Sequence, residues 1–471
     1  MSLERRIFYN TIAQSAGKIG AAVLGLITIS LLSRYLAEAG FGQYSTVIAF
    51  MGVFVTLADL GLYLIVLREI SKDGTDKTKI LSNALGLRFA TALAMLFFGA
   101  VLALAFPYDP VVKKTMFLGI GAFLFVSLNQ VLIGVFQKHL VQYLVVLSET
   151  AGRAINLLLV YLFIQTLLPL PFFILALLLG NAINFSLTFF WAKRYERFGI
   201  AFDFMVWKQI LLASWPLTFA VLLNLLYFKT DTVILSVFHS EEAVGIYSLP
   251  YKLLEGFLAF PAMFVGLIMP LLSQSAFVSW EKFKQILQQA FDSLLLMAIP
   301  VLISIQFFAQ DIINLLKGER QYLDSSVVLK ILVLAAVTIF FGTLFGYAVV
   351  AVNKQKTMIK GYLLGAATGL VLYFALIPKF SYWGAAWGTV ASEIVVTLFA
   401  YFLVRKASGS HVSFRLLPLA LPAAAGLVIF FALAKFFWIW ELLLGGIVYL
   451  LILAAFKAIP IKIVKELLFL Q

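Results

Sequence analysis

Ionisable side chains interrupt several long apolar stretches of this sequence. On insertion scales such a group in hydrocarbon costs at least about 2.5–3.5 kcal/mol, so we expect each one to face other helices or a water-filled cavity. Side chains of this kind can bind a charged ligand or a proton. They are Lys18, Asp59, Arg88, Glu149, Arg153, Lys229, Asp231, Lys252, Glu255, Asp292 and Glu393. Arg88 lies near the start of its stretch, so we expect it to snorkel to the interface.

Spacing along the chain separates these charges into pairs and single groups. Two pairs are three or four residues apart and share a helix face, so their members can neutralise each other or line a cavity together. They are Glu149 with Arg153 and Lys252 with Glu255. Lys229 and Asp231 are two residues apart and point to different faces of a helix. Because Lys18 has no acid within four residues, a cavity lining is the favoured interpretation for Lys18.

The sequence around these charges is typical of a membrane protein. Of its 471 residues 63% are hydrophobic and 12% are charged, whereas soluble domains carry about a quarter charged residues. The apolar runs are about 18–28 residues long, and a helix needs roughly 20 residues to cross the hydrocarbon core. We therefore predict an all-α membrane protein with about 14 transmembrane helices. The predicted spans are 9–35, 41–67, 82–106, 112–137, 141–164, 170–192, 209–238, 244–274, 285–309, 327–352, 358–377, 382–404, 415–434 and 440–457.

The distribution of Lys and Arg predicts the orientation. A cytoplasmic N-terminus places most of the 35 Lys and Arg residues in or beside inside segments, as the positive-inside rule requires. An even number of spans then places both termini in the cytoplasm, with the chain in the cell membrane. Arg5 and Arg6 precede the first apolar run. Because this run contains Lys18 and lacks a clear small-residue cleavage site, we interpret it as a retained span and not as a signal peptide.

The sequence carries no motif for catalysis or metal binding. It has no cysteine and three histidines, which excludes disulfides and thiolate sites and leaves little for a histidine site. We find no HExxH, GxSxG or P-loop motif. We therefore predict neither an enzyme nor a cofactor. The net charge of +13 is explained by cytoplasmic loops, so we expect no nucleic acid as partner.

An internal repeat predicts two halves. Residues 31–45, LLSRYLAEAGFGQYS, align with 234–248, ILSVFHSEEAVGIYS, which matches Gly42 with Gly245 and Glu38 with Glu241. Six predicted spans separate the two segments, so both halves have the same membrane orientation, as in transporters with parallel repeats. The predicted parts are an N-lobe at 1–192, a cytoplasmic interfacial linker at 193–208, a C-lobe at 209–404 and two additional helices with a tail at 405–471.

Several segments resemble polysaccharide flippases of the Wzx type. SRYLAEAGFGQYS and LADLGLYLIVLREISKD (57–73) are similar to the start of these proteins, and KTDTVILSVFHSEEAVGIYSLPYKLLEGF (229–257) to the start of their second half. VAVNKQKTMIKGYLLGAATG and LIPKFSYWGAAWGTVASEI, within 350–394, resemble their later spans. The superfamily also contains MurJ and the MATE antiporters. The resemblance implies two six-helix lobes in a V, a cavity lined by spans one, two, seven and eight, and alternating access.

The resemblance also implies a substrate, and for such a substrate the charges inside the predicted spans are the expected site residues. The substrate would be a polyprenyl-(pyro)phosphate-linked oligosaccharide, moved from the cytoplasmic to the outer face by a monomer surrounded by membrane lipids. The expected ligands of the anionic headgroup are Lys18, Arg88, Arg153, Lys229 and Lys252. The candidates for coupling to H⁺ or Na⁺ are Asp59, Glu149, Asp231, Glu255 and Glu393.

Two other functions stay open on the sequence. A MATE-like antiporter of small cations would need a mainly acidic or aromatic cavity, and the lysines and Arg153 argue against it. A membrane-embedded polysaccharide polymerase or ligase would be expected to carry a long external loop with functional Arg or His, which this sequence lacks.

Overall fold

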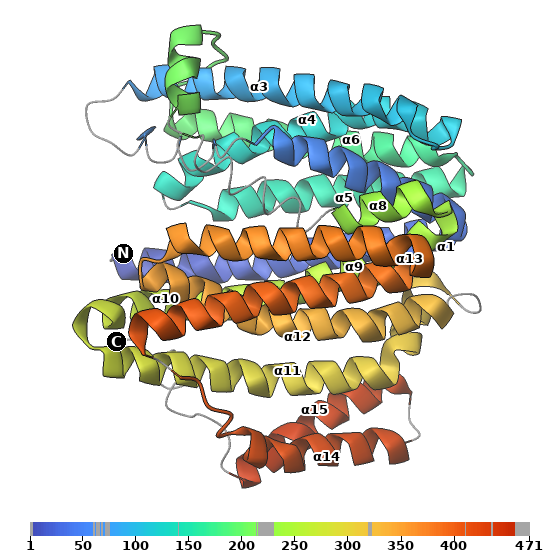
Figure 1. Ribbon diagram of the computed structural model, residues 1–471. Helices are drawn as coiled ribbons and strands as arrows, with labels where there is room; N and C mark the ends of the chain where they lie inside the picture. Colours follow the sequence, from blue (N-terminus) through green and yellow to red (C-terminus); the bar gives the residue numbers. More distant parts are fainter. Residues whose placement is uncertain are drawn as a thin grey trace. The chain divides into compact units, whose positions relative to one another are not determined.

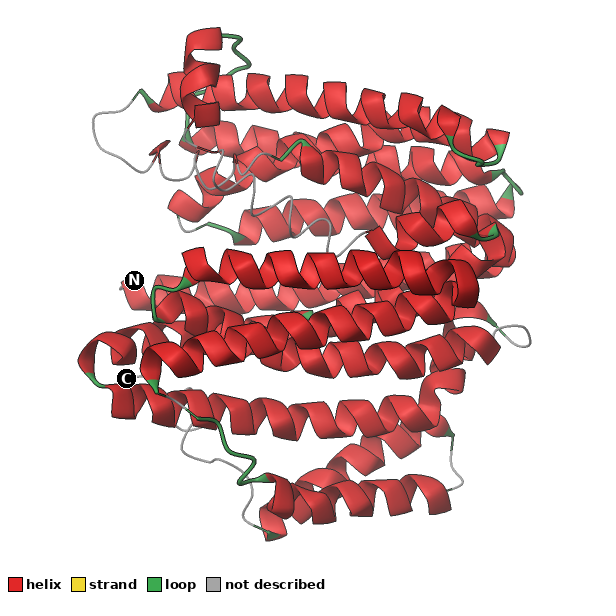
Figure 2. Ribbon diagram, viewed as in Figure 1, coloured by secondary structure: helices red, strands yellow, loops and turns green. Residues whose placement is uncertain are grey.

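The computed structural model describes residues 3–59, 62, 66, 69–70, 76–139, 141–212, 214, 230–318, 323–409, 411–434 and 437–456. Within these ranges the chain is helical, with short connections and no strand (Figure 2). The fold class predicted from the sequence, an all-α membrane protein, is confirmed. The chain packs into two compact units, Met1–Ser248 and Leu249–Gln471, and the boundary between them falls inside a helix.

The first unit contains the described helices before residue 249, and Figure 1 labels most of them. They are α1 (Leu3–Leu57), α3 (Lys77–Leu102), the 3₁₀ turn η1 (Ala103–Ala105), α4 (Pro110–Lys138), α5 (Tyr143–Gln165), α6 (Leu170–Tyr195), a short helix over 204–212, α8 (Thr230–Phe238) and the first part of α9 (Glu241–Phe257). Side chains cap the first turns of α3 and α4. Asp76 accepts from the Lys79 backbone N–H at 2.9 Å, and Asp109 from that of Val111 at 2.7 Å, with proline at the first helical position.

The second unit contains the rest of α9 and the helices that follow it. They are α10 (Ala259–Val278), α11 (Trp280–Lys317), α12 (Leu323–Ala351), α13 (Gln355–Ser408), α14 (Leu417–Leu433) and α15 (Trp438–Ala455). Tyr449 of α15 donates to the Leu296 carbonyl of α11 at 3.0 Å. The predicted boundary between lobes, at 208/209, stays a prediction, because the residues 215–229 that follow it lie outside the described ranges.

Two long helices each contain a reversal of the chain. α13 has 54 residues, and at about 1.5 Å per residue a straight helix of that length would be far longer than the roughly 30 Å hydrocarbon core. Its helical geometry is broken at Ser381 (φ 51°), and that of α1 at Ala37 (φ 54°). Both breaks fall between predicted spans. The structure describes ten helices long and apolar enough to span a membrane. The two reversals raise this number to twelve spans, and the shorter apolar helix α14 raises it to thirteen, which is consistent with the predicted total of about 14.

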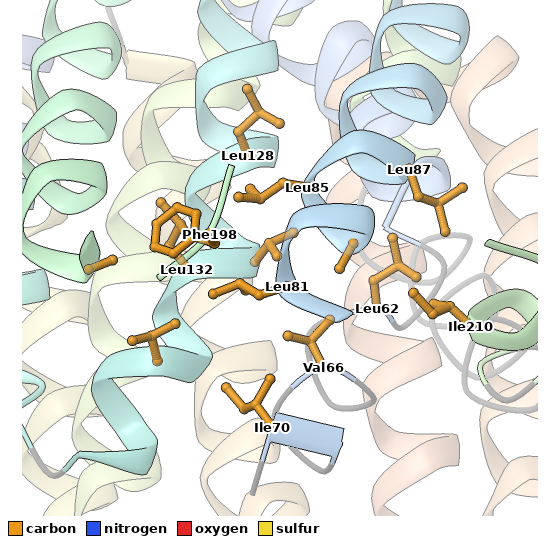
Figure 3. Packing of buried hydrophobic residues seen from close by; sticks show 14 of the residues in the cluster. Leu62, Val66, Ile70, Leu81, Leu85, Leu87, Leu128, Leu132, Phe198 and Ile210 are labelled. Atoms are coloured by element: carbon orange, nitrogen blue, oxygen red, sulfur yellow. The ribbon is translucent and has the colours of Figure 1, made fainter. Parts of the chain in front are cut away.

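Buried apolar side chains form separate cores. One core, shown in Figure 3, joins Leu81 and Leu85 of α3 to Leu132 of α4, to Phe198 of the predicted linker and to Ile210 of the short helix over 204–212. A second core packs the later part of α1 against α3 and α4, and a third packs α14 and α15 against α11. Small residues bring α5 and α6 together, because a Cβ on Gly152 would lie 2.6 Å from the Gly180 carbonyl oxygen.

Candidate functional site

A partly exposed group of charges lies on α1 and α5. The Arg153 guanidinium donates to Glu149 Oε1 at 2.7 and 3.0 Å and to the Ala21 carbonyl of α1 at 3.1 Å. The Arg153 side chain is 44% exposed and that of Glu149 33%. Lys18 is exposed one helical turn before Ala21, and it makes no ion pair with any described residue. Lys18, Glu149 and Arg153, which we call the α1–α5 charge group, therefore combine two cations with one acid.

Glycine gives Arg153 the space for this position. A Cβ on Gly25 would lie 2.7 Å from Arg153 Nη1, closer than carbon and nitrogen atoms normally approach without a bond. The guanidinium therefore bridges the two helices, because it donates to Glu149 on α5 and to the Ala21 carbonyl on α1. Because the side chain is 44% exposed, a phosphate can approach it, and guanidinium groups bind phosphate through charge-assisted hydrogen bonds.

Arg88 lies in a different environment. Its side chain is fully buried, with Nη1 at 2.8 Å from both Asp59 Oδ1 and the Ala58 carbonyl, Nε at 3.2 Å from the Ser127 carbonyl, and Nη2 against the Gln130 amide oxygen. The expectation that Arg88 snorkels to the interface is wrong. The physical reason is that α1 ends at Leu57, which leaves helix-terminal carbonyls that need donors.

Asp231 is buried in α8, with 1% exposure. It accepts hydrogen bonds at 2.6 Å from the Tyr247 hydroxyl of α9 and from the Thr232 backbone N–H. Lys229, predicted beside it as a headgroup ligand, lies outside the described residues.

The remaining predicted site residues lie in the second unit. Lys252 Nζ is 2.7 Å from Glu255 Oε2, and both side chains are about one third exposed. Glu393 is buried on α13. The two sequence pairs predicted from helical spacing, Glu149 with Arg153 and Lys252 with Glu255, are thus both formed, while their roles stay predictions.

The two repeat segments contact each other in a reciprocal way. A Cβ on Gly42 would overlap the Glu241 carbonyl oxygen, and a Cβ on Gly245 would overlap the Glu38 carbonyl oxygen. The backbones of α1 and α9 therefore meet directly, at positions that the repeat makes equivalent. The side chain of Gln43 crosses the contact and donates from Nε2 to Glu241 Oε2 at 2.7 Å.

A second ionic cluster lies outside the spans, where α4 and α6 end. Glu196 accepts from Lys138 Nζ and lies 3.0 Å from His139 Nε2. Burial raises the pKa of Glu196, but the hydrogen bonds and charges of Lys138 and His139 outweigh burial, and the net pKa is below its ordinary value. The cluster ties the two helix ends together.

With this geometry in view, sequence comparison decides the family. A model of the family described as "Polysaccharide biosynthesis protein" matches residues 7–276, more than half of the chain. The chain belongs to this family. The family resemblance inferred from sequence segments is thereby confirmed, and the matched region contains most of α1, all of α5 and α8, and the whole α1–α5 charge group.

The chain is also similar in sequence to individual proteins of polysaccharide biosynthesis and transport. The chain is 22% identical over 402 residues, 81% of its length and 93% of the relative, to a putative O-antigen transporter of Shigella flexneri. It is 23% identical over 290 residues, 60% of its length and 72% of the relative, to the capsular polysaccharide biosynthesis protein CapF of Staphylococcus aureus. The fold resembles that of the lipid II flippase MurJ in an inward closed conformation, with TM-score 0.80, 15% identity and coverage of 95% and 98%.

Sequence reasoning missed contacts that cross between helices. It noted Asp292 as a charge inside a span but found no partner for it, and the structure places Arg415 Nη2 at 2.9 Å, 123 residues further on. It aligned Gly42 with Gly245 as equivalent positions without expecting them to touch. The repeat itself was the available signal, because it marks these two positions as equivalent.

Proposed function

We propose that this member of the polysaccharide biosynthesis family is a flippase, moving a polyprenyl-(pyro)phosphate-linked oligosaccharide from the cytoplasmic to the outer face of the membrane. The α1–α5 charge group carries this proposal. Lys18 and the outward N–H groups of Arg153 offer charge-assisted hydrogen bonds to a phosphate. The names of the Shigella and Staphylococcus relatives, an O-antigen transporter and a capsular polysaccharide protein, support a saccharide cargo.

The charge of the cargo also favours this direction. In an inside-negative membrane, outward movement of an anion gains about 2.3 kcal/mol per charge per 100 mV. An ion gradient would supply the rest through one of the acids inside the spans, with H⁺ or Na⁺ as the coupling ion. Glu149 is the acid best placed for this role, because it touches the cation that would hold the phosphate.

Liposomes that contain the purified chain and a fluorescent lipid-linked oligosaccharide test the proposal. The measurement is the fraction of sugar protected from an impermeant glycosidase, with and without an imposed potential and H⁺ or Na⁺ gradients. We expect flipping to depend on the chain and to fall about ten-fold in Lys18→Gln, the loss of one charge-assisted hydrogen bond. Lys114→Gln is the matched control, because Lys114 is exposed at the start of α4.

A neutral analogue of the substrate separates the cargo from the mechanism. An oligosaccharide joined to the same lipid without phosphate should flip poorly, because the cations then have no partner. Equal flipping of both lipids, or normal flipping by Lys18→Gln, would refute recognition of the phosphate by this charge group.

We propose further that the contact of Gly42 with Gly245 separates during each transport cycle. Close backbone packing and the hydrogen bond between Gln43 and Glu241 contribute to this contact, and each is weak enough to break repeatedly. The chain has no native cysteine, so a Gln43→Cys, Glu241→Cys double variant can be cross-linked without background.

Oxidation of this variant should stop flipping, and reductant should restore it. The single-cysteine variants, treated in the same way, are the controls. Undiminished flipping by the cross-linked protein would show that the two segments need not separate.

A further inference from the structure

The segment between α6 and residue 214 is built into the first unit by its backbone. The Ala201 N–H donates to the Ser82 carbonyl at 3.0 Å, the Gly199 N–H to Ser82 Oγ at 2.9 Å and the Asp203 N–H to Asn83 Oδ1 at 2.8 Å. Gly86 permits this approach, because a Cβ there would overlap the Ala201 carbonyl oxygen. The segment is therefore fixed on α3.

A short helix follows, and it crosses the direction of α3. Asp203 caps it by accepting from the backbone N–H of Met205 at 3.0 Å. In Figure 1 this helix (green, at the start of α3) runs across α3. Because α3 is long and apolar enough to span the membrane, a helix across it runs along the membrane surface.

Apolar side chains occupy both faces of this helix. Val206 and Ile210 point into the core with α3 and α4, where Figure 3 labels Ile210. The opposite face exposes Phe204 (75%), Met205 (69%) and Leu212 (63%). Apolar groups exposed beside a span need a partner other than water.

The exposed charges of the segment 193–212 that form no ion pair are all basic. They are Lys193, Arg194, Arg197 and Lys208. None of them forms an ion pair with a described residue, because the two acids of the segment are already engaged: Glu196 with Lys138, and Asp203 with Lys79 at 3.3 Å. Lys208 is four residues from both Phe204 and Leu212, so an ammonium group rises from the middle of the apolar face.

From these observations we infer that residues 193–212 form a docking surface for anionic phospholipids of the adjacent leaflet. Phe204, Met205 and Leu212 enter the boundary between headgroups and acyl chains, and the four bases bind lipid phosphates. The positive-inside pattern makes this the cytoplasmic leaflet. The inference concerns resident lipid and does not depend on which cargo is flipped.

A fluorophore on a single Met205→Cys in the full-length chain tests this surface. The chain is placed in vesicles that contain either brominated phosphatidylglycerol or brominated phosphatidylcholine at the same fraction. We expect both lipids to quench, and the anionic lipid to be enriched about five-fold for each base near the label. A label at Val371→Cys, 68% exposed near the middle of the first span of α13, should show no preference and is the matched control.

Reversing two charges, in a Met205→Cys, Arg197→Glu, Lys208→Glu variant, should lower the enrichment at least five-fold while quenching by phosphatidylcholine persists. Absence of quenching by both lipids would show that water or another protein covers the surface. Equal quenching in the unreversed protein, or enrichment that survives reversal, would show that the bases do not bind anionic lipid. Each of these three results overturns the inference.

Discussion

Arg88 and Arg153 lie in apolar helices of the same unit, yet their surroundings are opposite. Arg88 is fully buried and is matched by a carboxylate, two carbonyls and an amide oxygen. Arg153 is 44% exposed and shares one acid and one carbonyl. The comparison teaches that a charge inside a span is not by itself evidence of a binding site. The unfilled donor capacity of an accessible charge is the better indicator.

The largest expected effect comes from removing the buried guanidinium. Arg88→Met should lower the free energy of unfolding by about 3–5 kcal/mol, because the buried carbonyls of Ala58 and Ser127 lose their donor and the partly buried Asp59 loses its ion pair. Thermal unfolding in detergent and the amount of chain in the membrane measure this. A stable Arg88→Met protein that no longer flips would instead make Arg88 a substrate ligand and break the comparison.

Arg153→Gln should have the opposite profile. We expect a stability change below about 1 kcal/mol, as for other exposed pairs, and a loss of flipping of about ten-fold, as for the loss of a hydrogen bond to a charged group. Thermal unfolding and flipping of Arg153→Gln are measured under the same conditions as those of Arg88→Met. Normal flipping together with normal stability would remove the α1–α5 charge group from the mechanism.

Glu149→Gln sharpens the interpretation of Arg153. If Glu149 only neutralises the guanidinium, its removal should tighten binding of the phosphate-bearing lipid by up to about five-fold, the upper value of an exposed pair. Binding is measured by titration of the lipid into detergent-solubilised protein. Loss of the response of flipping to the H⁺ or Na⁺ gradient would show instead that Glu149 couples transport to the ion.

The smallest effect is expected at Glu196, where an ionic cluster lies outside the spans. Because its pKa is lower in the folded protein, the stabilisation is complete above the ordinary carboxyl pKa and is lost as the pH falls through the lowered value. Glu196→Gln should lower the free energy of unfolding by about 0.5–1 kcal/mol at neutral pH. The variant should also lack the loss of stability that Glu196 causes as the pH falls. Unfolding curves of both proteins from neutral to acid pH should therefore converge, and parallel curves would contradict the assignment.

The sequence alone determined that lipid surrounds the apolar helices of this protein. It also determined the fold class and the ion pairs between residues close in the chain. Apolar runs of about 20 residues admit only helices, since lipid offers no hydrogen bonds to the backbone. Reversals near Ala37 and Ser381 were predicted as gaps between spans. The pair of Glu149 with Arg153 follows from helical geometry, because residues four apart share a face.

Only the tertiary structure decided which charges are accessible. Arg88 and Arg153 both lie inside predicted spans, and the difference in their accessibility arises from Asp59 beyond the end of α1, Ser127 of α4 and Ala21 of α1. The contact of Gly42 with Gly245 likewise depends on two segments about 200 residues apart in the chain. Helical periodicity fixes which residues share a face, but the partner of that face is set by packing between helices, which no local pattern encodes.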